Sequence, residues 1–210
     1  MLYRYRSAVH LQRELKAIED NYVFCSPFAS LNDPMEGVFG STRRARQAEN
    51  YRSIRRAITD IKAQVGICSF SEVHDHELMW AHYAGHFAGT CVAYRFAQLL
   101  ETLPSSVSFA RMFYSEKVPM VRHRTDSPET AAKMILSYKN HRWLYEREWR
   151  MFGPLGRVRY RNPKCVARIY LGSRISAEAR ALITQRMLPL RIAVHEMNID
   201  KYSLTFEPCS

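Results

Sequence analysis

Hydrophobic and polar positions follow two different periods along the chain. Residues Leu2–Arg6 alternate large apolar or aromatic side chains with arginine, which is typical of a half-buried strand. The next apolar residues recur at helical spacing and predict a helix that ends at Asn21: Val9, Leu11, Leu15 and Ile18. Asn, Asp and Pro residues between positions 26 and 40 predict a structured loop, because their side chains favour turns.

The same patterns assign the rest of the chain. Further strands are predicted at residues 22–25, 65–71, 90–94, 108–114, 149–152, 167–172, 192–194 and 202–206. Further helices are predicted at residues 41–64, 78–84, 97–103, 127–146 and 176–187. Strands and helices are mixed, and no internal repeat or linker interrupts them. We therefore expect an α+β fold class in a single domain that spans residues 1–210.

Length and composition limit the class of protein. The chain has 210 residues, of which 47% are hydrophobic, and this is enough for one full core. No apolar stretch approaches the ~20 residues that cross a bilayer, and the basic start leads into no signal-type segment. We expect a soluble, cytoplasmic protein with no membrane partner. The five scattered cysteines form no C-x-x-C pair, so we expect reduced thiols.

The net charge of +11 indicates a polyanionic partner such as nucleic acid, or an anionic substrate such as a dinucleotide. Many basic residues fall in two clusters: Arg43, Arg44, Arg46, Arg52, Arg55 and Arg56 in one, and Arg157, Arg159, Arg161 and Lys164 in the other. The solvated faces of a helix and of a hairpin explain these clusters equally well.

Four blocks hold more polar functional residues than a core requires: Tyr3–Arg6, Leu31–Glu36, Cys68–Tyr83 and Tyr145–Arg150. Functional sites are commonly assembled from element ends and loops that are far apart in sequence. We therefore expect the four blocks to converge on one cleft.

Glu146 and Glu148 are the strongest catalytic candidates. They lie two residues apart, so in a loop that enters a strand both carboxylates project from the same side and can address one ligand. Aromatic flanks at Tyr145 and Trp149 would exclude water, and an arginine partner would keep the carboxylates ionised. Exposed salt bridges with the neighbouring arginines are the alternative.

Ser69 and Ser71 alternate around Phe70 at the end of a predicted strand, so their hydroxyls face one side while Phe70 packs behind. The alternative is a strand end whose serines bond the following turn.

A short helix follows, in which Trp80 and Tyr83 share a face and His82 supplies an imidazole. For Trp80 a core anchor is the better explanation. Four histidines crowd thirteen residues: His74, His76, His82 and His86. Because the H-E-x-x-H pattern is absent, we assign no metal site.

Sequence blocks together resemble a bacterial domain family of unknown function: LNDPMEG at 31–37, CSFSE at 68–72, MWAHYA at 79–84 followed by GTCVAY, and WLYEREWR at 143–150 followed by ARIYLG. This resemblance implies no reaction. The P-loop, dinucleotide-binding and nucleophile-elbow motifs are absent.

The order of elements also resembles the ADP-ribosyltransferase fold, which implies a split central mixed or antiparallel sheet flanked by helices and NAD as substrate. The resemblance implies that Arg4 or Arg6 contacts NAD and that Ser69 and Ser71 shape the nicotinamide pocket. It also implies that Glu148 binds the nicotinamide ribose and aids formation of an oxocarbenium ion. The residue between the two serines departs from the family's usual threonine.

The same resemblance makes Glu146 the upstream member of the Glu-x-Glu pair. Tyr83 or His82 could supply the ring that stacks on nicotinamide. Asn32 and Asp33 of the LNDPMEG block complete the expected cofactor-binding residues.

The leading hypothesis is an NAD-consuming ADP-ribosyltransferase or NAD glycohydrolase, as an effector in a toxin or phage-defence system. A nucleic-acid or ribonucleoprotein acceptor would explain the basic surface. One alternative is a nucleic-acid-binding or nuclease module that uses the basic helix for phosphate contacts and the His and Glu clusters as acid and base. Another alternative is a non-catalytic interaction domain.

Overall fold

The structure is a computed structural model that describes residues 1–122 and 127–209. The chain forms two compact units that interleave along the sequence. Unit 1 comprises residues 1–24, 69–105 and 157–210, and unit 2 comprises residues 25–68 and 106–156. Three strands contain residues of both units: β2 (Tyr22–Pro27), β4 (Gly66–Ser71) and β11 (Gly156–Arg159).

Unit 1 is built on a mixed sheet. Its strands lie in the order β1 (Leu2–Arg6), β5 (Thr90–Tyr94), β12 (Val166–Leu171), β13 (Ala193–Asp200) and β14 (Ser203–Pro208). Neighbouring strands are antiparallel except for β12 and β13, which run parallel. Parallel neighbours need a long crossover, and α7 (Ala177–Met187) supplies it.

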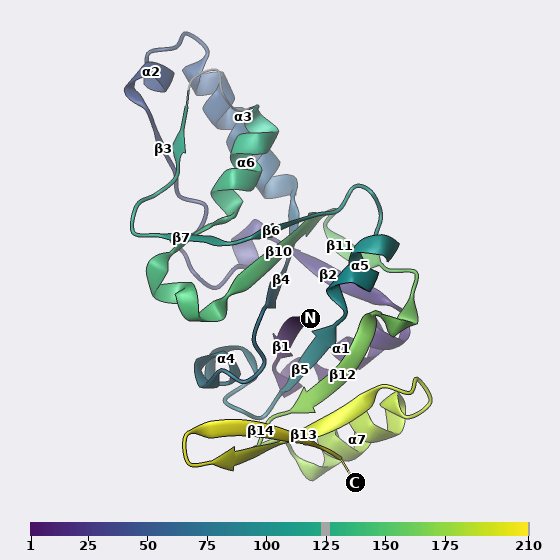
Figure 1. Ribbon diagram of the computed structural model, residues 1–210. Coiled ribbons are helices and arrows are strands. Elements are labelled where there is room, and N and C mark those ends of the chain that lie inside the picture. Colours follow the sequence, from purple (N-terminus) through teal and green to yellow (C-terminus); the bar gives the residue numbers. More distant parts are fainter. Residues whose placement is uncertain (123–126, 210) are drawn as a thin grey trace. The chain divides into compact units, whose positions relative to one another are not determined.

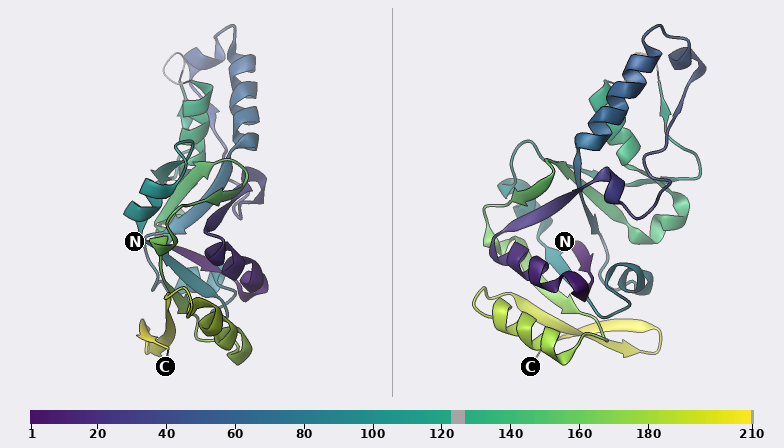
Figure 2. Two further views of the ribbon diagram at one scale, coloured as in Figure 1. Left: turned by 90° about the vertical axis from the view of Figure 1, so that its right-hand side faces the viewer. Right: turned by 180° about the vertical axis from the view of Figure 1, so that it is seen from behind.

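Successive side chains of β1 point to opposite faces of the unit 1 sheet, and helices pack against them on both faces. Arg4 and Arg6 point toward α1 (Leu11–Glu19), where both guanidinium groups pair with the Glu14 carboxylate. Tyr5 points the opposite way and packs edge-on against Trp80 of α4 (Glu77–Tyr83). Figure 2 shows α1 and α7 next to each other on one side of the strands. The remaining helical segments are η1 (Ala8–His10), α5 (Phe96–Thr102) and η4 (Pro163–Cys165).

Unit 2 combines short strand pairs with two packed helices. Antiparallel pairs are formed by β6 (Ser108–Arg111) with β10 (Glu148–Gly153), and by the unit 2 ends of β2 and β4. The parallel pairs are β3 (Gly40–Ser41) with β8 (Met120–Val121), and β7 (Phe113–Ser115) with β9 (Tyr138–Asn140). The helical segments are η2 (Phe28–Ser30), α2 (Arg43–Arg46), α3 (Tyr51–Gln64), α6 (Pro128–Leu136) and η3 (His141–Glu146).

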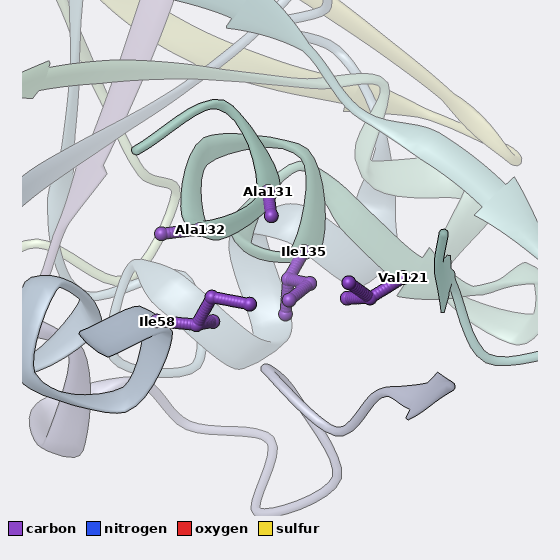
Figure 3. Close-up of a cluster of buried hydrophobic side chains, with 5 residues drawn as sticks. All are labelled: Ile58, Val121, Ala131, Ala132 and Ile135. Carbon is purple, nitrogen blue, oxygen red and sulfur yellow. The ribbon is translucent and has the colours of Figure 1, made fainter. Parts of the chain in front are cut away.

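The core of unit 2 lies where α3 and α6 run side by side (Figure 1). Ile58 of α3 and Ile135 of α6 are fully buried there against small alanines of α6 and Val121 of β8 (Figure 3). Alanines at the contact allow the two helices to approach closely. A second cluster buries Ile67, Leu136 and Phe152.

The predicted α+β class and mixed sheet are confirmed, as are most of the predicted strands. The chain divides into two compact units, and the expectation that residues 1–210 form a single domain stays a prediction. All five cysteines are free thiols. In the described part of the chain, no helix combines the length and the apolar character that a membrane span requires.

Two predicted helices are shorter than the sequence suggested. Residues 41–64 form α2 and α3 with a break around Glu49, because the intervening exposed residues offer no apolar side chain that packs on a core. The helix predicted at 127–146 ends at Leu136, and Tyr138 pairs with Phe113 of β7 instead. Val9 is 85% exposed and precedes α1, so it does not belong to the buried helical face.

The strand predicted at 108–114 is divided into β6 and β7, on either side of Met112. Met112 is buried, and its backbone N–H donates to the Glu148 carbonyl at 2.9 Å. The two halves then take different partners, β10 for the first and β9 for the second.

Replacing Ile58 with alanine should destabilise unit 2. The side chain is fully buried between α3 and α6, so the change removes apolar contacts and leaves a cavity. We expect the free energy of unfolding to fall by about 2–5 kcal/mol in urea denaturation. Thr59→Ala, one residue further on the exposed face, is the control and should stay within about 0.5 kcal/mol of wild type. Equal effects of the two changes would contradict the packing.

Candidate functional site

Unit 2 contains a group of buried ionisable side chains that we call the charged cluster. Each member is at most 6% exposed: Glu36, Lys139, Glu146, Glu148 and Arg150. Charged side chains are almost never fully buried unless they are paired. Such a concentration of buried charge is a typical property of functional sites.

Three local structures bring these side chains together. The parallel pairing of β7 with β9 places Lys139 opposite Tyr114. Arg147 adopts a left-handed conformation with φ of 45°, which turns the chain between η3 and β10. Glu148 and Arg150 then lie two residues apart on β10 and share one face.

Lys139 is the centre of the cluster. Its Nζ lies 2.5 Å from Oε2 of Glu146, 3.2 Å from Oε2 of Glu148 and 3.2 Å from Oε1 of Glu36. The same Nζ lies 5.0 Å from the centre of the Trp143 ring, a cation–π distance. Both carboxylates of the Glu-x-Glu pair therefore contact Lys139, while the prediction that they address one ligand stays a prediction.

Arg150 is the second cation of the cluster. Its Nε donates to Oε1 of Glu148 at 2.8 Å, and its Nη2 donates to Glu36. Its Nη1 donates to the Leu136 carbonyl at the end of α6 at 2.8 Å. Arg150 thus joins the carboxylate of the loop at 31–37 to that of β10.

The loop that carries Glu36 is itself held in place. Asp33 accepts a hydrogen bond from the Met35 backbone N–H at 2.9 Å, which forms an Asx turn. Gly37 has φ of +69°, and a Cβ there would lie 2.4 Å from the Phe28 ring. The Gly37 carbonyl accepts a hydrogen bond from buried Lys62. These contacts direct Glu36 inward.

The electrostatics of the cluster favour the ionised forms of its cations. Burial alone lowers the pKa of Lys139, but Glu148, Glu146 and Glu36 outweigh burial and raise this pKa above its usual value. The pKa of Arg150 is raised in the same way, against the effect of burial. Three carboxylates and two cations leave the cluster with one formal negative charge.

Tyr114 supports Glu148 from the neighbouring strand. Its hydroxyl oxygen accepts a hydrogen bond from the Glu148 backbone N–H at 2.8 Å. Burial raises the pKa of Tyr114, and the nearby Glu148 and Glu146 carboxylates add to this effect, so the phenol stays neutral at physiological pH. The start of β10 is therefore fixed by side chains as well as by its strand pairing.

A pocket of about 200 Å³ opens beside the cluster in unit 2. Glu36 and Lys139 line it, together with buried Asp33. Its other lining residues are mainly apolar and include Met35, Val38, Val118 and Pro119. A concave apolar surface with a few convergent polar groups is the usual form of a small-molecule site.

Unit 1 holds the arginines predicted to contact NAD. Arg4 is 6% exposed, and its Nη2 donates to the Phe24 carbonyl at 3.2 Å. Arg6 Nε lies 3.0 Å from Oε1 of Glu14, which also pairs with Arg4 at 3.7 Å. Arg13 Nε lies 4.0 Å from the same carboxylate, so Glu14 contacts three guanidinium groups. The contact of Arg4 or Arg6 with NAD stays a prediction.

The serine strand end lies beside β1 in unit 1, since Tyr3 pairs with Ser71 across the two strands. Ser71 is buried, and its Oγ accepts a hydrogen bond from the Val73 N–H at 3.1 Å. Ser69 is exposed and Phe70 packs edge-on against Tyr94. The hydrogen bond from Val73 agrees with the alternative in which Ser71 bonds the following turn. The role of Ser69 and Ser71 in a nicotinamide pocket stays a prediction.

The helix α4 confirms Trp80 as a core anchor, because the ring is fully buried. Tyr83 is partly buried and His82 is exposed, and their ring centres lie 6.3 Å apart. The helix ends at Tyr83, so His82 and His86 do not share a helical face. Within residues 1–122 and 127–209, no group of three or more His, Cys, Asp or Glu is placed to hold a metal ion.

His74 packs against two tyrosines in unit 1 whose rings also contact each other. Its ring centre lies 4.8 Å from that of Tyr3 and 4.5 Å from that of Tyr170. Phe206 of β14 completes this aromatic group at 5.2 Å. His74 is therefore part of a packed aromatic layer.

The predicted blocks thus meet in pairs. The blocks at 31–36 and 145–150 meet in unit 2, through Glu36, Glu148 and Arg150. The block at Tyr3–Arg6 meets Ser71 and Trp80 in unit 1. The convergence of all four blocks on one cleft stays a prediction.

Three members of the charged cluster are not among the predicted site residues: Glu36, Lys139 and Arg150. The LNDPMEG block contains Glu36, but the prediction names Asn32 and Asp33 of that block. Asp33 lines the pocket and Asn32 is exposed. Lys139 had been expected inside a helix, where it would not face a carboxylate on β10.

Residues 79–151 match a family described as "Protein of unknown function (DUF2971)". This match confirms the predicted resemblance to a domain family of unknown function. It includes the blocks at 79–84 and 143–150, while the LNDPMEG and CSFSE blocks lie before it. No curated protein and no solved structure matches the chain.

Lys139→Met should strongly destabilise the protein, because it leaves three buried carboxylates with one cation. Breaking a buried ion pair by removing one partner typically costs about 3–5 kcal/mol, and we expect a loss of that size in urea denaturation. Lys117→Met at the exposed rim of the same pocket is the control and should change stability little. A loss below about 1 kcal/mol for Lys139→Met would show that the cluster does not depend on this cation.

His74 should make the protein less stable at acid pH. Burial lowers the pKa of His74 in the folded state; the nearby Asp75 carboxylate opposes this effect and the Arg168 charge adds to it, and the net shift is downward. As pH falls through about 6.5, the unfolded state binds this proton and the folded state does not, so stability falls. We expect His74→Phe to lose less stability than wild type between pH 7 and pH 5 in urea denaturation. Parallel pH profiles for the two proteins would refute this assignment.

Proposed function

We propose that unit 2 carries an NAD-consuming activity, either ADP-ribosyl transfer or NAD glycohydrolysis. The observation that supports it is the net negative, buried charged cluster next to an apolar pocket. The proposal includes an effector role in a toxin or phage-defence system and a cytoplasmic location. Both rest on the resemblance of the sequence to the ADP-ribosyltransferase fold.

The charge of the cluster suits this reaction. Cleavage of NAD breaks the bond between C1′ of the ribose and the nicotinamide nitrogen, and the electron pair leaves with nicotinamide. The ribose then carries positive charge as an oxocarbenium ion. Fixed negative charge close to that position stabilises the transition state more than the ground state. Buried Asp33 adds a second negative charge at the pocket.

The size of the pocket suits the nicotinamide end of the substrate. Its volume is about 200 Å³. A cavity of roughly 150 Å³ accommodates a benzene molecule, so this pocket has room for one substituted six-membered ring. Apolar Met35, Val38 and Val118 would contact the ring faces, and Glu36 would lie closest to the ribose.

In this proposal Glu36 and Glu148 have different roles. Glu36 borders the pocket, and its buried carboxylate would act on the ribose through its charge rather than by direct contact. Glu148 is joined to Glu36 through Lys139 and Arg150. It would maintain the negative charge of the cluster. It would also bind the nicotinamide ribose, as the resemblance to ADP-ribosyltransferases implies. After nicotinamide leaves, water or an acceptor nucleophile forms the new bond to C1′ and its proton passes to a carboxylate.

Glu148→Gln should reduce nicotinamide release from NAD without preventing folding. The variant keeps most of the side chain's shape but removes its charge, and lost electrostatic stabilisation of this kind costs on the order of 10²–10³ in rate. Glu36→Gln should show a similar loss, because it changes the carboxylate nearest the pocket. The measurement is nicotinamide release by chromatography, at equal concentrations of folded protein verified by circular dichroism.

Glu101→Gln on the exposed surface of α5 is the matched control and should retain the wild-type rate. Equal rates for wild type and both cluster variants would show that the charged cluster is structural. No release by wild type, with water or with protein, RNA or DNA as acceptor, would exclude the proposed reaction and favour a non-catalytic interaction domain.

A further inference from the structure

The α2–α3 region of unit 2 exposes a dense set of arginines, which we call the arginine face. All are exposed to solvent: Arg43, Arg44, Arg46, Arg52, Arg55, Arg56 and Arg122. Arg122 follows β8 and lines a small hollow together with Arg55, so it belongs to the same surface. None of these residues belongs to the charged cluster or its pocket.

Helical geometry aligns the arginines of α3. Arg52, Arg55 and Arg56 are separated by three and four residues and therefore lie on one side of the helix. The opposite side carries Ile54 and Ile58, which pack toward α6. Packing of the apolar side leaves the arginine side facing solvent.

Few acidic groups neutralise this face. Residues 42–60 and Arg122 contain only two acidic side chains, Glu49 and Asp60. Asp60 lies 3.9 Å from Arg56, and both side chains are highly exposed, so this pair contributes little. Arg55 contacts the Tyr51 hydroxyl at 3.4 Å and the Phe39 ring at 5.6 Å. The local charge is therefore strongly positive.

We propose that the arginine face binds the phosphate backbone of nucleic acid without sequence preference. Every exposed cation in the region is arginine, whose planar guanidinium matches phosphate oxygens in pairs. The one lysine of α3, Lys62, is buried. α3 extends over 14 residues, or about 21 Å, which is long enough to contact several phosphates of one strand.

The pattern of apolar residues disfavours an anionic membrane as the partner. Helices that bind membrane surfaces insert bulky apolar side chains on the side that meets the lipid. The isoleucines of α3 instead pack within unit 2, and the outward side carries Ser53, Thr59 and Ala63 besides the arginines. Ala63 is the largest apolar side chain on that side of α3, and it is too small to insert into the bilayer.

The hollow beside Arg55 combines an apolar floor with a polar edge. The Tyr51 hydroxyl donates to the Ser41 hydroxyl at 3.3 Å, and both residues line the hollow with Arg55 and Arg122. The hollow is too small for a base or a ring, at about 20 Å³. A phosphate oxygen would fit at its mouth, between the two guanidinium groups and the hydroxyls.

The test measures binding of the full chain to fluorescent 20-nucleotide single-stranded RNA and to a DNA duplex of the same length by anisotropy. The salt concentration is varied from 50 to 200 mM. The triple variant Arg52→Gln, Arg55→Gln, Arg56→Gln removes three phosphate contacts. Because each contact contributes roughly 0.9 to the slope of log affinity against log salt for a duplex, we expect the slope to fall by about 2–3.

The matched control removes the same charge from unit 1: Arg161→Gln, Lys164→Gln and Arg174→Gln. These side chains are exposed, and the change should leave the slope and the affinity close to wild type. Equal weakening by both triple variants would show that only net charge matters and would overturn the proposal. Negligible binding by wild type at 50 mM salt, or tighter binding to phosphatidylserine vesicles than to nucleic acid, would also overturn it.

Discussion

The interaction on which unit 2 depends is the ion pairing of Lys139 with three buried carboxylates. Burying an ionised carboxylate costs several kcal/mol unless a cation and hydrogen bonds compensate. Lys139 compensates Glu36, Glu146 and Glu148 together, and Arg150 supplies the second cation. The loop at 31–37, the end of η3 and the start of β10 therefore have to meet at one point, or the charges remain unpaired.

The same constraint brings buried charge to the wall of the pocket. Glu36 and Lys139 belong both to the charged cluster and to the wall of the pocket. The charge of the buried cluster therefore contributes to the electrostatic potential in the pocket. Two cations for three carboxylates leave that surface negative, although the whole chain carries a net charge of +11. The excess positive charge lies elsewhere, and much of it is on the arginine face. The protein therefore separates a buried cluster with a net negative charge from an exposed surface that is strongly positive.

Much of the local structure was predictable from single stretches of sequence. The alternation in Leu2–Arg6 predicted β1, and it also predicted that the arginines and tyrosines face opposite sides of the sheet. Helical periodicity predicted the second half of the 41–64 helix. It failed for residues 137–146, where strand pairing of Tyr138 with Phe113 competes with helix propensity. That competition involves residues distant in sequence, so no local pattern reveals it.

The sequence alone determined the composition of the site: a Glu-x-Glu pair, an arginine two residues later and an acidic loop near residue 36. It also determined the exposed arginines, because the isoleucine stripe of α3 requires the opposite side to face solvent. Only the tertiary structure decided that the two carboxylates of the pair converge on Lys139, and that Glu36 rather than Asn32 joins them. The physical reason is that pairing a buried charge depends on distances of about 3 Å between side chains, and these follow from the strand register and from the left-handed turn at Arg147.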